Sequence, residues 1–273
     1  PPLVLCSLIT VGYSANALGG AGGPLAVLII AIVASELGKA VSKETRVDIL
    51  VTPLVTIFSG VGLSMLIAAP IGAAASQVGT LIMWATEQAP LVMGILVSVI
   101  VGVALTLPIS SAAICAALGL TGLAGGAAVA GCCAQMVGFA VMSYKENGVG
   151  GLVSQGLGTS MLQMGNIVKN PRIWIAPTLA SAITGPLATC VFHFEMNGAA
   201  VSSGMGTCGL VGQIGVYTGW VSDIAAGTKA AITPMDWAAM VLLCFVLPAV
   251  LSVIFCEIER KLGWIKEGDL KLN

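Results

Sequence analysis

Residues Gln88 to Tyr144 read QAPLVMGILVSVIVGVALTLPISSAAICAALGLTGLAGGAAVAGCCAQMVGFAVMSY, and this stretch contains no Asp, Glu, Lys, Arg or His. Such a run is too long and too apolar to form the core of a soluble domain. Because about 20 helical residues cross a bilayer core, the stretch holds two crossings and a shorter segment from Pro108 to Gly122. We therefore expect a multi-pass membrane protein with an all-α transmembrane bundle.

The composition of the whole chain agrees with this expectation. Charged residues make up 8% and hydrophobic residues 57% of the 273 residues, whereas about a quarter of a soluble domain is charged. We expect a single transmembrane domain over residues 1–273. The net charge of −1 provides no basic field for nucleic acid, so we expect no such partner. No basic segment precedes the first apolar run, which argues against a signal peptide and for a natural chain that begins upstream of Pro1.

Residue types that carry enzyme chemistry are scarce. The eight cysteines form no C-x-x-C pair, and the single histidine excludes a His-rich metal site. There is no serine nucleophile elbow and no zincin helix. We therefore expect no catalytic residue, no metal and no cofactor, and interpret the cysteines as small buried apolar side chains.

Six apolar segments are long enough, or nearly so, to cross a bilayer, and Leu3 to Leu18 is a possible seventh. The six are Leu25 to Val41, Ile49 to Ala69, Leu91 to Leu107, Leu123 to Ser143, Ile173 to His193 and Trp237 to Cys256. Ala199 to Trp220 also has the length, but it contains six glycines and makes a poor continuous helix. We predict that this segment is re-entrant or broken.

Lys and Arg gather in three clusters, which we expect on the cytoplasmic side. They are Lys39, Lys43 and Arg46; Lys145, Lys169 and Arg172; and Arg260, Lys261, Lys266 and Lys271. This placement requires the short segment from Pro108 to Gly122 to reach across the membrane. It also requires Ala199 to Trp220 to enter and leave on the outer side.

Two segments have the pattern of interfacial helices. From Gly151 to Asn170, uncharged polar side chains recur every three or four residues, which predicts one polar stripe on a helix. The stripe consists of Gln155, Thr159, Gln163, Asn166 and Asn170. It suits either a helix at the membrane interface or one that lines an aqueous cavity. Ser76 to Gln88, with Trp84 as an interface anchor, is a weaker example.

The short segment from Pro108 to Gly122 is a first candidate for function. It has a proline at its start, two hydroxyls and a glycine at its end, and it is too short to span as a helix. Irregular backbone at membrane depth survives only where protein or water satisfies it. Ser110 and Ser111 either cap a half-helix that faces a polar ligand or simply close a tight connection.

The segment from His193 to Gln213 is a second candidate. His193 and Glu195 are either a solvated loop pair or, inside a cavity, a donor and an acceptor for hydroxyl groups. The glycines near them permit close approach of the backbone to a ligand. Adding the cavity-facing residues of the other segments, the predicted solute-binding residues are Ser110, Ser111, Gln163, Asn166, His193, Glu195, Asn197, Gly204, Gly206, Thr207, Gly209 and Gln213.

Two motifs resemble the EIIC-like membrane proteins of the bacterial phosphotransferase system. They are NPRIWIAPTLASAITGPLAT at Asn170 to Thr189 and GMGTCGLVGQ at Gly204 to Gln213. The subgroup that is most similar includes proteins described as regulators of perfringolysin. The resemblance implies an EIIC-like fold with re-entrant hairpins in the bacterial cytoplasmic membrane, and a homodimer. Residues 1–273 contain no segment that resembles an EIIA or EIIB domain, so we expect that they do not transfer phosphoryl groups by themselves.

Two functions follow from this resemblance. The first is a permease that moves a small neutral polar solute, such as a sugar, by alternating access. A neutral solute is expected because neither candidate segment contains Lys or Arg. The second is a membrane sensor that keeps the permease fold and signals to a cytoplasmic phosphotransferase or regulatory partner through the tail from Glu257 to Asn273.

Overall fold

The computed structural model describes residues 2–19, 23–44 and 47–272. These ranges are predominantly helical, and the extended pairing found within them is an isolated bridge between Gly122 and Met196. The all-α prediction is therefore confirmed. By its internal contacts the chain divides into two compact units, Pro1–Thr80 with Ala116–Gly119, and Leu81–Cys115 with Leu120–Asn273.

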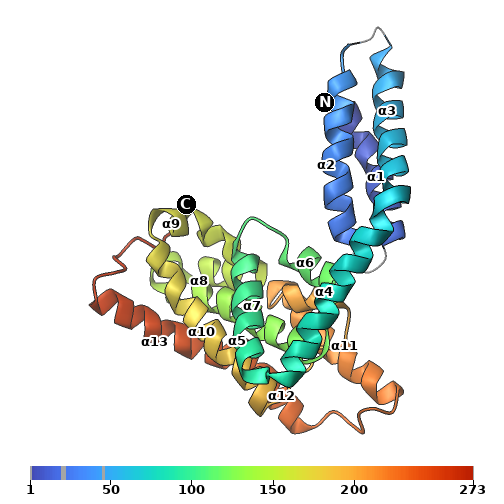
Figure 1. Cartoon of the computed structure of the whole chain (residues 1–273). Helices are drawn as coiled ribbons and strands as arrows, with labels where there is room; N and C mark the ends of the chain where they lie inside the picture. Colours follow the sequence, from blue (N-terminus) through green and yellow to red (C-terminus); the bar gives the residue numbers. More distant parts are fainter. Residues whose placement is uncertain (1, 20–22, 45–46, 273) are drawn as a thin grey trace. The chain divides into compact units, whose positions relative to one another are not determined.

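The first unit contains three long helices that pack against one another: α1 (Pro2–Gly19), α2 (Gly23–Val41) and α3 (Asp48–Leu63) (Figure 1). Small and β-branched residues fill their core, namely Val11, Ala15, Ala26, Ile30, Ala34 and Ala68. Large apolar side chains face outward, with Tyr13 79% and Phe58 73% exposed. Such outward faces suit contact with lipid rather than water.

One helix is longer than the sequence analysis predicted. α3, the π turn Ser64–Ala68 and α4 (Ala69–Gln88) join into a helical run of 41 residues, Asp48–Gln88. The separate interfacial helix predicted at Ser76 to Gln88 is therefore wrong. Pro70 lies within this run, although proline cannot donate a backbone hydrogen bond to the preceding turn. The π turn directly before it rearranges that bonding, and the helix continues.

The second unit begins within α4, at Leu81, and contains the remaining elements except the end of α6 from Ala116 onward. They are α5 (Pro90–Thr106), α6 (Ser111–Leu118), α7 (Gly122–Met142), α8 (Tyr144–Val153), a π turn Ser154–Gly158, a 3-10 turn Ser160–Gln163, α9 (Met164–Lys169), a 3-10 turn Pro171–Trp174, α10 (Ile175–Pro186), a π turn Leu187–Val191, 3-10 turns Ala200–Gly204 and Cys208–Leu210, α11 (Val211–Ala225), α12 (Pro234–Val241), a π turn Leu242–Val246 and α13 (Leu247–Lys261).

Within the described ranges, five helical runs are long and apolar enough to cross a membrane. They are Pro2–Gly19, Asp48–Gln88, Gly122–Met142, Pro171–Val191 and Pro234–Lys261. The predicted crossings at Leu25 to Val41 and Leu91 to Leu107 are also helical, as α2 and α5. The apolar runs of the sequence therefore correspond to helices throughout.

α7 forms the centre of the second unit. In its most apolar window 89% of the residues are buried, and α5, α10 and α13 pack around it (Figure 1). Small residues allow this close packing. A Cβ atom at Gly131 would lie 2.0 Å from the carbonyl oxygen of Ser98 in α5. The glycine therefore sets how closely α5 and α7 approach each other.

The second unit has two ends of different charge. The helical run Pro171–Val191 extends for about 30 Å, at about 1.5 Å per residue. The basic end, where this run begins and α13 ends, carries Lys145, Lys169, Arg172, Arg260, Lys261, Lys266 and Lys271. The second and third basic clusters of the sequence thus gather at one end, as expected for a cytoplasmic side. Arg46 of the first cluster lies outside the described residues.

The segment from Pro108 to Gly122 carries the chain back toward the other end. α5 and α7 run in the same direction, because the hydroxyl of Thr106 at the end of α5 donates to Oε1 of Gln135 at 3.3 Å. Gln135 lies 13 residues along α7 from Gly122, which is about 20 Å of helix. The connection must return over that distance before α7 begins. The segment therefore returns over about 20 Å, and its crossing of the membrane stays a prediction.

The basic-end hairpin, residues 144–170, enters and leaves the bundle at the basic end. At its start, Lys145 pairs with Glu257 of α13 at 3.0 Å. At its end, the amide nitrogen of Asn170 donates to Asp269 at 2.8 Å. Both bases of this hairpin therefore lie beside the C-terminal part of the chain.

This hairpin is not the continuous helix that the polar stripe predicted. Thr159 accepts a hydrogen bond from the backbone N–H of Met161, and Asn170 accepts one from that of Arg172. These two polar residues are therefore N-caps that begin new turns. Gln155 and Gln163 are fully buried and hydrogen-bonded to each other. The stripe packs inside the protein because its polar groups satisfy one another there.

The pocket-end hairpin, residues 197–223, enters and leaves at the opposite end. The side-chain amide of Asn197 donates to Asp223 at 2.9 Å and joins the two bases. Between them the chain forms two 3-10 turns before α11 returns. The predicted broken, re-entrant segment at Ala199 to Trp220 is confirmed, and it enters and leaves on one side as the orientation required.

The turns of the two hairpins meet inside the bundle. The Thr207 hydroxyl donates to the Gly156 carbonyl at 2.5 Å and lies 3.6 Å from the Met136 sulfur of α7. Met136 is 14 residues from the start and 6 from the end of α7. The meeting point therefore lies within the length of the central helix rather than at either end.

Candidate functional site

A cavity of about 530 Å³ opens at the pocket end of the second unit. It is lined by Phe192, His193, Phe194, Glu195, Asn197, Trp220, Asp223, Thr228, Lys229, Thr233, Met235, Asp236 and Ala239. These residues come from the end of α10, the pocket-end hairpin, the loop after α11 and the start of α12.

The segment after α10 presents its polar side chains to the cavity by alternation. Phe194 and Met196 are buried, whereas Glu195 between them is exposed, as is His193 directly before them, whose φ angle of 44° is left-handed. Side chains of an extended chain point to opposite sides in turn. Met196 anchors this arrangement by exchanging two backbone hydrogen bonds of 3.0 Å with Gly122.

Asn197 connects three parts of the cavity wall. Its amide nitrogen donates to Glu195 at 3.1 Å and to Asp223 at 2.9 Å. Its carbonyl oxygen accepts the backbone N–H of Gly122 at 3.1 Å. One amide thereby holds two carboxylates at a set spacing and ties them to the start of α7.

The opposite wall is built around Asp236. A capping box at the start of α12 fixes this residue. The Thr233 hydroxyl accepts the backbone N–H of Asp236, and the Asp236 carboxylate accepts the backbone N–H of Thr233 at 2.7 Å. The same carboxylate pairs with Lys229 at 2.8 Å. The Lys229 ammonium also lies 5.4 Å from the centre of the Trp220 ring. This wall is therefore a fixed aromatic and charged surface.

The cavity has an excess of hydrogen-bond acceptors. It contains three carboxylates, and Lys229 pairs with one of them, Asp236. Among the described residues, Glu195 and Asp223 have no ion-pair partner and share the amide of Asn197. Acceptors beside an aromatic wall suit a ligand that donates hydrogen bonds and has an apolar face. Within the described ranges, no three His, Cys, Asp or Glu side chains gather closely enough to hold a metal ion.

Comparison with known proteins assigns the chain to a family. A family model described as "Phosphotransferase system, EIIC" matches residues 2–272. This chain belongs to the EIIC family. No curated protein and no solved structure matches it. With its long apolar helices, the chain is therefore a membrane protein of the EIIC type. The resemblance to the perfringolysin-regulator subgroup stays a prediction.

Ten of the twelve predicted solute-binding residues of this EIIC protein lie in three places. His193, Glu195 and Asn197 line the cavity. Gly204, Gly206, Thr207, Gly209 and Gln213 belong to the turn and returning helix of the pocket-end hairpin. Gln163 and Asn166 lie in the basic-end hairpin, where the Asn166 amide donates to Gln163 at 2.8 Å. The structure therefore brings together the first three and separates them from the others.

The two serines contribute to the framework of the EIIC fold. Ser110 caps α6, because its hydroxyl accepts the backbone N–H of Ala113 at 3.1 Å. The buried hydroxyl of Ser111 donates to the carbonyl of Gly204 at 2.7 Å. The half-helix therefore contacts the pocket-end hairpin directly. Gln213 donates to the Cys133 sulfur at 3.2 Å, while its buried carbonyl oxygen has no partner among the described residues.

Sequence reasoning missed ten of the thirteen residues that line the EIIC cavity, among them Trp220, Asp223, Lys229 and Asp236. A signal for three of them exists in the sequence. Between Glu195 and Glu257, the only charged residues are Asp223, Lys229 and Asp236. Charges that gather between two apolar segments mark a loop whose side chains face water or a polar ligand.

Asn197 should be essential for the shape of this EIIC cavity. We expect Asn197→Ala to destabilise the protein by about 2 kcal/mol, because the carboxylates of Glu195 and Asp223 lose the donor that they share. Thermal unfolding in detergent measures this. Asn16→Ala, at an exposed position of α1, serves as the control and should change stability by less than about 0.5 kcal/mol. Equal melting temperatures for the two variants would contradict the assigned role.

Proposed function

We propose that this EIIC protein is a permease that moves a small neutral polar solute, such as a sugar, by alternating access. The observation that carries the proposal is the meeting of two hairpins from opposite ends, through Thr207 and Gly156. Broken segments that meet inside a bundle are typical of transporters, whose solute sites lie between them. A purely structural bundle has no need of irregular backbone at this depth.

The cavity at the pocket end supports a sugar-like solute. Glu195, Asn197 and Asp223 supply acceptors and a donor for hydroxyl groups, and Trp220 contributes to the wall. Carboxylates and amides fix hydroxyl orientation, while aromatic side chains cover the apolar face of a ring. In this proposal the solute enters here and then passes toward the hairpin turns.

The hairpin turns supply the moving parts in this proposal. A single hydroxyl-to-carbonyl bond joins Thr207 to Gly156, and a bond of this kind is worth only about 1 kcal/mol net. The bases of the hairpins are held more firmly, by Asn197 at one end and Asn170 at the other. We therefore infer that the turns part first, while the base of the pocket-end hairpin stays in place.

A ligand screen over many candidate solutes tests the site. A panel of sugars and polyols is added to the detergent-solubilised protein, and a binder raises the melting temperature. When the solute concentration is 100 times its dissociation constant, binding raises the free energy of unfolding by about 2.7 kcal/mol. We expect Glu195→Gln and Asp223→Asn to reduce the shift at least tenfold in apparent affinity.

Glu267→Gln provides the control for this screen, because Glu267 is exposed and lies at the basic end. The control should retain the full shift. A solute that binds all three variants equally would remove the cavity from the proposed pathway. A panel without any binder, on a folded sample, would count against a sugar-like solute.

The alternative, a membrane sensor, depended on the tail from Glu257 to Asn273 as a free cytoplasmic surface. Much of this tail packs against the basic-end hairpin, with Leu270 fully buried. Deleting Glu267 to Asn273 would therefore disturb the hairpin as well as any signalling surface. Glu267→Lys changes only an exposed charge. A lost regulatory phenotype with unchanged transport in that variant would favour the sensor.

The cellular setting follows from the family and the charge distribution. We propose the bacterial cytoplasmic membrane as the location, with the basic end toward the cytoplasm. A phosphotransferase partner in the cytoplasm would then meet the basic end. The homodimer implied by the family resemblance belongs to the same proposal. Cross-linking of membranes before solubilisation would test both associations.

A further inference from the structure

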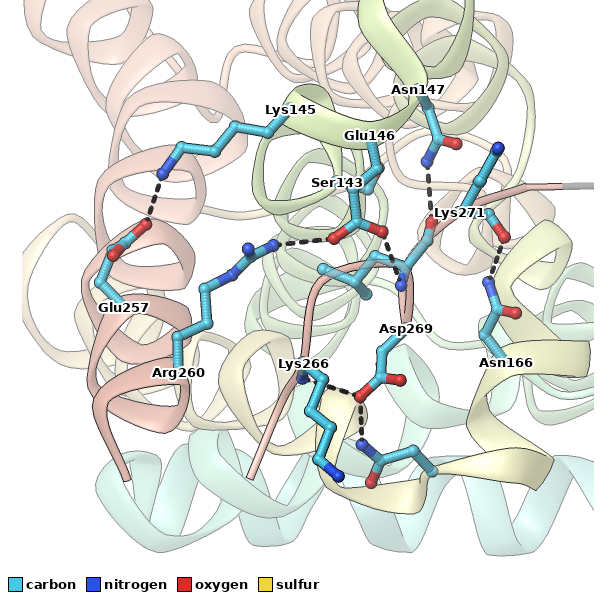
Figure 2. A network of polar contacts seen from close by, with 12 residues as sticks. Ser143, Lys145, Glu146, Asn147, Asn166, Glu257, Arg260, Lys266, Asp269 and Lys271 are labelled. Carbon is cyan, nitrogen blue, oxygen red and sulfur yellow. Dashed lines mark hydrogen bonds and ion pairs between the residues drawn. The ribbon is translucent and has the colours of Figure 1, made fainter. Parts of the chain in front are cut away.

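The C-terminal strap, residues Lys266–Leu272, is held by side chains of the basic-end hairpin (Figure 2). Leu270 is its centre. Its backbone N–H donates to Glu146 at 2.9 Å, and its carbonyl accepts from Asn147 at 2.8 Å and from Gln163 at 2.9 Å. Three side chains from two parts of the hairpin therefore bind one backbone unit.

The neighbouring residues of the strap are bound in the same way. The carbonyl of Lys271 accepts from Asn166 at 3.0 Å, and the backbone N–H of Leu272 donates to Asn147 at 2.8 Å. Asp269 is held by Asn170 at its side chain (Figure 2). The amide side chains act as donors and acceptors for backbone groups of the strap, whose residues 267–270 form turns.

An apolar contact completes the surface that binds the strap, which we call its seat. The Leu270 side chain is fully buried and packs in a cluster with Ile167 of the hairpin, Phe139 of α7 and Ile265. The strap thus combines one buried leucine with hydrogen bonds between its main chain and side chains of the hairpin. It forms no helix, and Gly263 and Gly268 adopt positive φ angles of 72° and 95° on either side of its start. Turns at these glycines allow the strap to leave its seat without unwinding α13.

We propose that the strap is a lock on the basic-end hairpin, which closes the hairpin when seated and must be released before the hairpin can move. The proposal rests on the proposed function in one respect, because it takes the hairpin to be a moving part. The lock requires that the strap and residues 144–170 open together, as one unit, while α7 stays folded.

Hydrogen–deuterium exchange of the full-length protein in detergent, with no solute present, tests this directly. We expect the amides of Leu270 and Leu272 to exchange at the rate of the protected hairpin amides, at least tenfold faster than those of α7. Exchange of the strap at the slow rate of α7 would show a static element and overturn the lock. A strap that exchanges while the hairpin stays protected would show a frayed end, which also overturns it.

Two variants sharpen the test. Leu270→Ala should raise exchange in the strap and in residues 144–170 by a common factor of at least tenfold, without affecting the pocket-end hairpin. Leu262→Ala, at a position that is 58% exposed, is the matched control and should change neither. Gln163→Ala removes one strap bond from the hairpin side and should act in the same direction as Leu270→Ala. An increase confined to the strap in both variants would refute the coupling. Failure of the sugar screen leaves this test intact, because no solute takes part in it.

Discussion

Replacing Gly206 with alanine should prevent the pocket-end hairpin from closing on α7. Its φ angle of +53° lies in the left-handed region, which costs an alanine about 1 kcal/mol. A Cβ atom there would also lie 2.7 Å from the Cβ of Cys132 and 2.9 Å from the backbone nitrogen of Cys133. Because α7 is the central helix, neither atom can move aside cheaply. We expect a loss of roughly 4 kcal/mol or more, seen as a large fall in melting temperature.

Gly209→Ala is the matched control for this experiment. Gly209 has nearly the same φ angle, +52°, but the nearest atom to its Cβ would be 3.8 Å away. This variant carries the conformational cost alone, about 1 kcal/mol. The difference between the two melting temperatures therefore measures the close approach of the hairpin to α7. If the two variants have the same melting temperature, Gly206 does not lie against α7 as described.

The second large effect is expected at the ion pair between Glu146 and Arg260. These side chains lie 3.1 Å apart with only 11% and 16% of their surface exposed. Glu146 also accepts the backbone N–H of Leu270, so Glu146→Ala leaves a mostly buried guanidinium and a backbone donor without partners. Breaking such a pair costs about 3–5 kcal/mol. Thermal unfolding in detergent should show this loss.

A neighbouring pair at the same end gives the control. Lys145 and Glu257 are 3.0 Å apart but 72% and 47% exposed, and exposed pairs contribute at most about 1 kcal/mol. Glu257→Ala should therefore have little effect on the melting temperature. Figure 2 shows both pairs at the base of the basic-end hairpin. A comparable loss in the two variants would mean that burial does not distinguish them.

Much of the fold could be predicted because membrane helices are encoded locally. The uncharged run from Gln88 to Tyr144 indicated two crossings, and α5 and α7 occupy them. The glycines from Ala199 to Trp220 indicated a broken segment, and the chain breaks there. Each of these features depends on the solvation of a backbone segment in lipid, which the segment's own composition decides.

Other predictions depended on neighbours that the pattern could not identify. The polar stripe from Gln155 to Asn170 had the period of an interfacial helix, but two of its members are N-caps and others bind the strap. Ser76 to Gln88 had the pattern of a separate interfacial helix, but it is the last part of the continuous helical run Asp48–Gln88. In both cases the local signal was compatible with two structures, and packing selected one.

The sequence by itself determined the all-α class, most of the helices and the EIIC family resemblance, because apolar length and motif are properties of contiguous residues. Tertiary structure alone decided that Glu195, Asp223 and Lys229 share a cavity, and that Thr207 meets Gly156. It also decided that Leu270 is buried in a seat more than 100 residues away in the chain. These groups come together through the direction of helices and the return of two hairpins. Contacts between residues so far apart in the chain depend on how several elements pack together, so no single segment encodes them.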